Sequence, residues 1–266
     1  MIRQLITFIP TVFFSATAVL FSTLTSAPVN AGESLSVTLP DMEISLNYAQ
    51  PVRLDQVLTD TQNLKLQQPQ AMPFWLAAQF IEPSNNADID EKKKAAIHQL
   101  QTLAANDKDS SHKAHLLINA LQKAQFNFRH FIPLDNDHVR LKNEDNPLLS
   151  GQYTLLTSPR VNKVRIFGTQ NSWYPVDMIE HGTIDQYLEQ AALPENSDTQ
   201  LVFVIQPDGA LITADNAYWN TKPVFIAPGA TIYIGFDSLP DEFEHLNQDI
   251  ADLLRYQTPL TDKDAE

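Results

Sequence analysis

Hydrophobic and polar residues alternate in two short segments that follow the N-terminal region. Residues 35–39 (LSVTL) and 44–48 (ISLNY) each place every second side chain on one face, which is the pattern of a half-buried β-strand. Pro40 and Asp41 lie between them and are typical turn residues, so the two segments predict a β-hairpin. Residues 53–58 follow with the spacing of a short helix.

The same order of segments returns later in the chain. Residues 161–167 and 173–176 predict two strands, and a helix is expected to begin just before residue 184. Residues 184–188 (IDQYL) match residues 54–58 (LDQVL) position by position in character. The agreement predicts an internal repeat, with chance similarity between short motifs as the alternative.

The ends of the two repeated units agree as well. Residues 150–156 and 228–234 each place a glycine turn before an alternating strand. In the second unit, residues 201–205 and 210–213 flank the turn sequence Pro207-Asp208-Gly209, which predicts a hairpin. Each unit is therefore expected to contain a hairpin, a short helix and returning strands, which is the order of a β-grasp domain.

The first unit carries an insertion of helical composition. Residues 86–106 and 110–125 are rich in Ala, Leu, Lys and Gln and contain no Gly or Pro, so they predict two helices. Their apolar positions are spaced so that each helix has one core-facing side. We expect an antiparallel helical hairpin over about residues 84–126.

The last predicted element is an amphipathic helix over residues 241–257. Its apolar side chains recur every three or four residues and form one stripe, made of Phe243, Leu246, Ile250, Leu253 and Leu254. Acidic residues occupy other positions, which disfavours contact with anionic lipid head groups. The stripe is expected either to pack on the protein's own body or to dock onto a protein partner.

The first 31 residues read as an export signal. Arg3 provides a positive flank, a mostly apolar run follows, and Val29 and Ala31 place small residues before a possible cleavage site. An uncleaved membrane anchor is the alternative, because about 20 mostly apolar residues are long enough to span a bilayer. Cleavage is favoured, since Pro10 and several hydroxyl residues dilute the run.

These patterns together predict an α+β protein with two β-grasp domains. The expected organisation is a signal peptide over residues 1–31, a first β-grasp domain over 32–158 with the helical insertion, a second over 159–240, the helix over 241–257 and a tail over 258–266.

Composition narrows the functional classes. The formal net charge of the chain is -14, and such an acidic body repels nucleic acid, whose recognition depends on Lys and Arg neutralising phosphates. The sequence contains no cysteine, which excludes disulfides, thiol chemistry and a lipid anchor on cysteine. We therefore expect an exported protein without a lipid anchor that is held together by its hydrophobic core.

Arginines gather in the sequence near the predicted junction of the two units. Arg129, Arg140, Arg160 and Arg165 all precede or begin the second unit. A local basic group on an acidic body suits an anionic ligand, because guanidinium binds carboxylate through two hydrogen bonds. The alternative is that these arginines form ordinary surface ion pairs with nearby acids such as Asp135. Arg129, Arg140 and Arg160 are the predicted ligand-binding residues.

Aromatic residues add candidate sugar-stacking surfaces, while catalytic motifs are missing. Tyr218 and Trp219 are predicted to contact glycan, with Trp173 and Trp75 as further candidates, although large aromatics are more often part of a core. The chain has no nucleophile elbow, zinc-protease motif, phosphate-binding loop or dinucleotide fingerprint. We therefore predict no catalytic residues, no metal and no cofactor.

Several motifs taken together resemble the GfcC/YjbG family of capsule biosynthesis proteins. They extend from Asn146 to the closing helix and comprise residues 146–155, 159–161, 204–209, 217–220 and 228–236. The resemblance implies a periplasmic protein with two SLBB-like β-grasp domains similar to those of Wza, the outer-membrane polysaccharide exporter. It also implies no established catalytic activity. An arginine in a cleft of the first domain is implied too, and Arg129 matches it best, with Arg140 second.

The expected function is an accessory role in the assembly or export of capsule or exopolysaccharide. The protein is expected to be monomeric and to bind either the glycan or the export machinery, such as an outer-membrane exporter. The alternative is a periplasmic enzyme that modifies or trims the polysaccharide. A third possibility is a module that docks on an outer-membrane channel without touching sugar.

Overall fold

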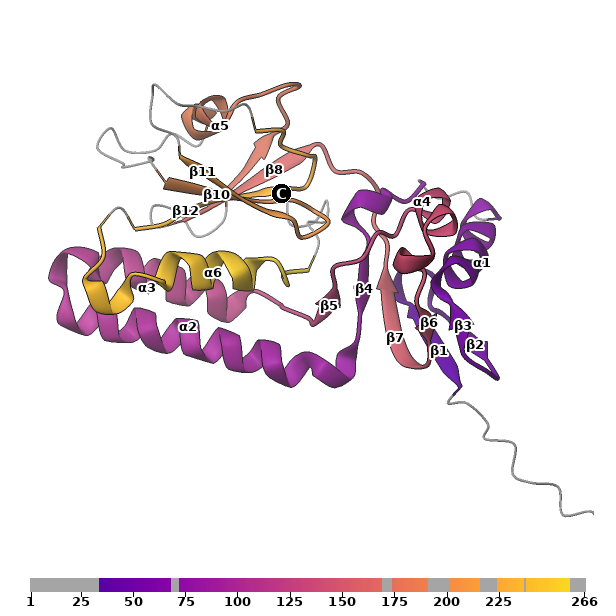
Figure 1. The fold of residues 1–266 in the computed structure, drawn as a ribbon. Coiled ribbons are helices and arrows are strands. Elements are labelled where there is room, and N and C mark those ends of the chain that lie inside the picture. The colour runs from indigo at the N-terminus through magenta and orange to yellow at the C-terminus, as the bar shows by residue number, and fades with distance from the viewer. Residues whose placement is uncertain are drawn as a thin grey trace, which may run out of the picture. The chain divides into compact units, whose positions relative to one another are not determined.

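The alternating segments form strands in two separate five-stranded sheets (Figure 1). The computed structural model describes residues 34–67, 72–168, 174–190, 201–215, 224–236 and 238–258. The first sheet has the order β2-β1-β7-β4-β5. Its strands are β1 (Leu35–Leu39), β2 (Ile44–Tyr48), β4 (Gln79–Ile81), β5 (Arg129–His130) and β7 (Gly151–Leu156).

The second sheet has the order β11-β10-β12-β8-β9. Its strands are β8 (Lys163–Gly168), β9 (Tyr174–Asp177), β10 (Leu201–Ile205), β11 (Leu211–Asp215) and β12 (Thr231–Ile234). Two further short strands, β3 (Val52–Arg53) and β6 (Leu148–Leu149), pair with each other in the first unit.

Both sheets have the same topology. In each, a hairpin strand pairs in parallel with the last strand of its unit, β1 with β7 and β8 with β12. The other three pairings in each sheet are antiparallel. A glycine with positive φ opens or precedes the last strand in both units, Gly151 at 94° and Gly229 at 84°. The internal repeat predicted from the sequence is thus present as two sheets with matching strand order, while the β-grasp assignment itself stays a prediction.

Helices follow the hairpin in both units, at the places where the sequence predicts them. The helices are α1 (Leu54–Leu66), α2 (Asn86–Asn106), α3 (Lys108–Lys123), α4 (Asn136–Leu141), α5 (Ile184–Gln190) and α6 (Leu246–Leu254). Helix α1 buries Leu54, Val57 and Leu58 against the alternate residues of β1. That cluster is the core of the first unit.

The second sheet is covered on both faces, because its strands alternate between two cores. Val202 and Val204 of β10 belong to the core that contains α5. Phe203 and Ile205 belong to the core that contains α2, α3 and α6. Figure 1 shows these three helices along the β10–β12 part of this sheet. Burial on both faces of the strand explains why residues 202–205 are all apolar.

The helical hairpin is inserted in the chain of the first unit, between β4 and β5, as predicted. Its buried side chains, however, join the core of the second sheet. The Asp107 side chain accepts a hydrogen bond from the Asp109 backbone at 3.0 Å and begins α3 as an N-cap. The insertion therefore links the two repeated units through shared packing.

The closing amphipathic helix buries its apolar stripe in the protein's own core. The predicted segment is a short 3-10 turn, Asp241–Phe243, followed by α6. The five stripe residues are between 0 and 5 % exposed and pack in the core shared with α2 and α3, namely Phe243, Leu246, Ile250, Leu253 and Leu254. The stripe thus packs on the protein's own body, which is one of the two expected arrangements, and partner docking through these residues stays a prediction.

The predicted signal peptide, the side chains of Tyr218 and Trp219, and residues 259–266 of the predicted tail lie outside the described residues. Within the described ranges, no helix has the length and apolar character needed to cross a membrane.

Candidate functional site

Arg129 is a buried arginine at the edge of the first sheet. It lies in β5, opposite Ile81 of β4, and its side chain is 4 % exposed. Its Nη1 donates a hydrogen bond of 2.9 Å to the backbone carbonyl of Pro207, in the turn between β10 and β11. Among the described residues, no carboxylate forms an ion pair with it. A side chain of the first unit thus reaches a turn of the second.

Burial lowers the pKa of Arg129 to about 10, from its ordinary value of 12.5. Loss of hydration is the main cause, and the positive charge of Arg255 adds to it, while Asp208 and Tyr256 act in the opposite direction. Because one pKa unit corresponds to about 1.4 kcal/mol, burial disfavours the charged form by about 3 kcal/mol. The group still carries its charge at neutral pH.

One edge of the Arg129 guanidinium has no partner among the described residues. The Nε atom is buried without a hydrogen bond to any described residue, and the one hydrogen bond of the side chain uses Nη1. The remaining edge, formed by Nε and Nη2, is the fork that binds a carboxylate with two parallel hydrogen bonds. Arg129 therefore has unused capacity for an anionic group.

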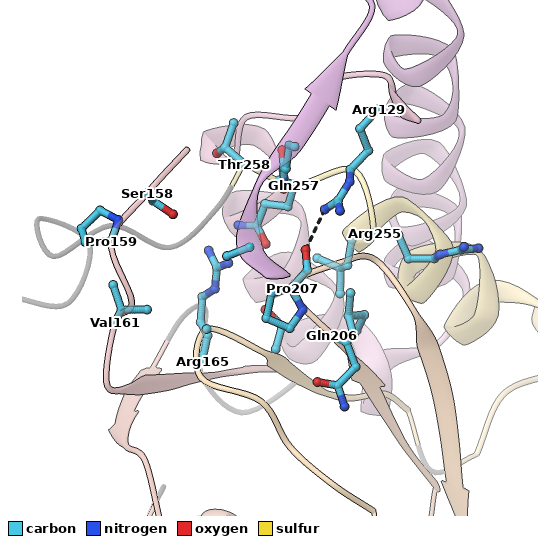
Figure 2. Close-up of a pocket in the computed structure, with 16 residues that line it drawn as sticks. Arg129, Ser158, Pro159, Val161, Arg165, Gln206, Pro207, Arg255, Gln257 and Thr258 are labelled. Carbon is cyan, nitrogen blue, oxygen red and sulfur yellow. Dashed lines mark hydrogen bonds between the residues drawn. The ribbon is translucent and has the colours of Figure 1, made fainter. Parts of the chain in front are cut away.

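A small hollow, here called the arginine hollow, lies against this group. It has a volume of about 30 Å³, opens partly to solvent, and is lined by three arginines, Arg129, Arg165 and Arg255. No aspartate or glutamate is among the described residues that line it. Figure 2 shows the Arg129 and Arg165 side chains directed toward the middle of the hollow, whereas the Arg255 guanidinium points away.

Neutral polar side chains also line the arginine hollow, beside several apolar residues. The side chains of Gln79 and Gln257 line it, and each has a buried Oε1 atom without a donor among the described residues. Gln79 Nε2 donates to the Gln257 backbone carbonyl at 2.8 Å, which fixes the orientation of the Gln79 amide. Ser158 and Thr258 complete the polar wall. The hollow thus offers both donors and acceptors to a ligand.

A larger hollow, here called the junction cleft, lies on the other side of Arg129. Its volume is about 670 Å³, which is in the range of small-molecule sites. Arg129 and Arg255 line it together with aromatic side chains, Trp75 and Phe131. Asp208 also lines it, and its carboxylate accepts a hydrogen bond of 2.9 Å from the Ala210 backbone.

Phe131 contacts both Arg129 and Arg255. The Arg255 guanidinium carbon lies 4.3 Å from the Phe131 ring centroid, and that of Arg129 lies 5.4 Å from the same centroid, both distances typical of cation–π contacts. Arg255 Nε also donates to the Gly209 carbonyl at 2.8 Å. A Cβ atom on Gly209 would lie 2.4 Å from the Phe131 ring, so only glycine fits this turn. Both arginines therefore donate a hydrogen bond to the β10–β11 turn and contact the same aromatic ring.

The structure places the predicted arginines in different environments. Arg140 is exposed and lines neither hollow. Arg160 is exposed, stacks on Phe74 at 5.9 Å and lines a separate pocket with Asp177. Arg129 and Arg165 both line the arginine hollow. Of the three predicted ligand-binding arginines, only Arg129 lines the two hollows, and ligand binding by Arg129, Arg140 and Arg160 stays a prediction.

Surface ion pairs between the arginines and nearby acids were the alternative to ligand binding. Among the described residues, Arg129 and Arg140 do not form such pairs with Asp135 or Asp145. Asp135 accepts a hydrogen bond from the His138 backbone and caps α4, while Asp145 pairs with the His138 ring at 2.8 Å. No cluster of three His, Asp or Glu side chains suited to a metal occurs among the described residues.

Sequence reasoning missed Arg255 and Phe131. Arg255 directly follows α6, and a basic residue at a helix end is common enough that it gives little signal. Phe131 follows β5 and is 38 % exposed, so it resembles any aromatic residue at a strand end. Trp75 was considered from the sequence, and the structure places it half-buried at the junction cleft.

Comparison with known proteins places the chain in a family. The family description "Capsule biosynthesis GfcC, N-terminal" matches residues 31–160, and "Capsule biosynthesis GfcC C-terminal" matches residues 174–259. The chain is 34 % identical over 195 residues to YjbG of Escherichia coli (strain K12), an uncharacterized protein. That similarity covers 71 % of this chain and 78 % of the relative. The chain therefore belongs to the GfcC/YjbG family of capsule biosynthesis proteins.

Proposed function

We propose that this protein is a periplasmic accessory factor for the assembly or export of capsule or exopolysaccharide, and that it acts by binding glycan without catalysing a reaction. Membership of a capsule biosynthesis family supports the process. The export signal expected over residues 1–31 supports the compartment. The chemistry of the junction supports the mode of action.

One observation carries the binding proposal. Arg129 is 4 % exposed, keeps its charge, and has one guanidinium edge without a partner among the described residues. It lies between the arginine hollow and the junction cleft and lines both. A buried donor group at the wall of a ligand-sized cleft is the arrangement that fixes the orientation of a polar ligand.

The walls of the junction cleft suit a sugar. Trp75 and Phe131 offer apolar ring faces, on which the C–H face of a sugar can stack. Arg129 and Arg255 donate hydrogen bonds, and Asp208 accepts them. Sugar hydroxyls both donate and accept, so a cleft with both kinds of group and an aromatic wall favours glycan over a purely apolar ligand.

The test is the amount of surface polysaccharide, relative to total cellular polysaccharide, in a strain that lacks the protein. We expect surface polymer to fall in the deletion strain and to return with the wild-type protein. Arg129→Met should restore it poorly, whereas Arg140→Met, which changes an exposed arginine outside both hollows, should restore it fully. Immunoblots of periplasmic fractions control for protein level. Unchanged surface polymer in the deletion strain would refute the proposed function.

Catalysis is tested separately with purified protein and purified polysaccharide. The chain length of the polymer, measured by size-exclusion chromatography with light scattering, should remain constant during incubation. The pattern of its substituents, measured by NMR, should also stay unchanged. Shortening or modification of the polymer that disappears in Arg129→Met would replace the binding proposal with an enzymatic one.

A further inference from the structure

The arginine hollow is distinct in charge from the rest of the molecule. Its described lining contains Arg129, Arg165 and Arg255 and no carboxylate, in a chain whose formal net charge is -14. From this we infer that the arginine hollow is a subsite for the carboxylate of a uronic acid, a sugar acid within the polysaccharide. The inference rests on the proposed function and deepens it by naming the chemical class of the ligand.

Charge is the first step of the argument. Arg129 is 4 % exposed, so it is largely withdrawn from water, and no carboxylate among the described residues pairs with it. Buried charges are stable only when another charge or several hydrogen bonds compensate them. An anion at the open edge of the Arg129 guanidinium supplies that compensation, and a neutral sugar does not.

Geometry selects the kind of anion. The unused Nε and Nη2 edge of Arg129 is a planar fork, which matches the two oxygens of a planar carboxylate. Figure 2 shows Arg165 directed into the same space from the opposite side. A carboxylate placed there accepts two hydrogen bonds from Arg129 and faces the positive charge of Arg165, which lines the same hollow.

Size excludes larger groups. The hollow has about 30 Å³, and one water-sized sphere needs about 10–15 Å³, so there is room for about two oxygen-sized atoms. A carboxylate has two oxygens, whereas phosphate and sulfate have four. A whole sugar ring does not fit and must remain outside, where the junction cleft of about 670 Å³ lies against the same Arg129.

The neutral groups favour a sugar acid over a simple carboxylate or an acidic peptide. Gln79 Oε1 and Gln257 Oε1 are buried acceptors that lack a donor among the described residues. A bare carboxylate has no hydrogen to give them. A uronic acid carries hydroxyl groups beside its carboxylate, and these donate to such acceptors. The aromatic wall of the adjoining cleft, Trp75 and Phe131, is likewise suited to a sugar ring.

The experiment titrates the full-length protein with D-glucuronate and D-galacturonate, and with D-glucose as the neutral counterpart. Binding is followed in ¹H–¹⁵N spectra of the arginine Nε–H groups. Arg129→Lys and Arg165→Lys each remove one signal and so assign it. We expect the two signals to shift with a uronate, to shift little with glucose, and to return when the uronate is removed by dialysis.

Matched variants separate a built subsite from general attraction. Arg129→Lys keeps the charge but removes the fork, and should weaken uronate binding by about tenfold to a hundredfold, the value of one or two charge-assisted hydrogen bonds. Arg140→Lys makes the same change on the exposed surface and should leave binding unchanged. Equal binding by wild type and Arg129→Lys would overturn the inference.

Competing ligands test whether the arginine hollow selects a sugar acid. Inorganic phosphate or a glutamate tripeptide that displaces the uronate with equal or higher affinity overturns the sugar-acid assignment. Equal binding of glucose and glucuronate does the same. Failure of uronates to bind, in a protein whose deletion still lowers surface polymer, refutes the inference and leaves the proposed function standing. Uronate binding in a protein whose deletion leaves surface polymer unchanged refutes the proposed function instead.

Discussion

Arg129 gains little folding stability from its buried position. Burial disfavours its charged form by about 3 kcal/mol, as judged from the pKa of about 10. Its one hydrogen bond, to the Pro207 carbonyl, returns about 1.5–3 kcal/mol, the usual contribution of a bond from a charged donor. The two values nearly cancel, so this hydrogen bond alone does not explain a charge at this position, whereas the proposed ligand would.

The first prediction follows from that balance. Arg129→Met keeps a long side chain in the same space and removes both the charge and the hydrogen bond, so the free energy of unfolding should change by less than about 1 kcal/mol. Urea unfolding followed by circular dichroism measures it. A loss of more than about 2 kcal/mol would mean that Arg129 mainly holds the β10–β11 turn in place.

The second prediction concerns Gly209, in the turn to which Arg129 and Arg255 donate hydrogen bonds. Gly209 and Gly151 have similar backbone angles, with φ of 88° and 94°, so alanine at either position is strained by about 1–2 kcal/mol. Only at Gly209 would the new Cβ meet the Phe131 ring, at 2.4 Å, whereas at Gly151 it meets nothing within 4 Å.

Gly209→Ala should therefore destabilise the fold by about 1–3 kcal/mol more than Gly151→Ala, because the ring must move. Displacement of Phe131 should also weaken uronate binding in Gly209→Ala and not in Gly151→Ala. Urea unfolding and the arginine Nε–H titration measure the two effects. Equal behaviour of the two variants would show that Phe131 moves without consequence.

At the level of elements, α6 closes the core of the second sheet. Asn247 is 7 % exposed and bonds the Phe236 backbone in both directions, accepting from its N–H at 2.9 Å and donating to its C=O at 2.8 Å. These bonds fix α6 beside the end of β12. Removal of α6 would uncover the apolar face formed by Phe203 and Tyr233, so a truncated protein is unsuited to a test of partner docking.

The third prediction tests this attachment. Asn247→Leu leaves the buried N–H and C=O of Phe236 without partners, and each such group costs about 1–3 kcal/mol. The expected loss of unfolding free energy is about 3 kcal/mol. Gln248→Leu changes the exposed neighbour in the same helix turn and should have almost no effect. A small effect of Asn247→Leu in urea unfolding would mean that α6 is held by apolar packing alone.

For the whole molecule, the strand and helix patterns were readable from the sequence because each follows a local rule. Residues 35–39 alternate between apolar and polar side chains and form β1. The helix predicted over residues 86–106 has the same bounds as α2. The sequence did not indicate which elements pack against each other. The stripe of α6 indicates that the helix buries one face, but nothing local states that this face meets α2 and the second sheet.

The same limit applies to the site. Arg129 was identified, but its contact with Pro207 joins residues 78 positions apart in the sequence. Arg160 and Arg165 look alike as sequence positions. Arg165 lies within β8 on the same side as Phe167, so it is carried into the interior, while Arg160 precedes the strand and stays exposed. Tertiary contacts of this kind require the fold.

The fourth prediction depends on the charge of the whole molecule. The formal net charge of -14 should repel a polyanionic glycan at a distance, whereas the proposed carboxylate subsite would attract it only at close range. Salt shortens the range of the repulsion from about 30 Å at 0.01 M to about 8 Å at 0.15 M, but it screens buried groups much less. The association rate of a polyuronate, measured by stopped-flow fluorescence, should therefore rise with salt over this range. The affinity for a single uronate should change by less than about threefold, because its partners are buried. A polymer rate that falls with salt would mean that an exposed basic surface captures the chain first and that the arginine hollow is not its point of entry.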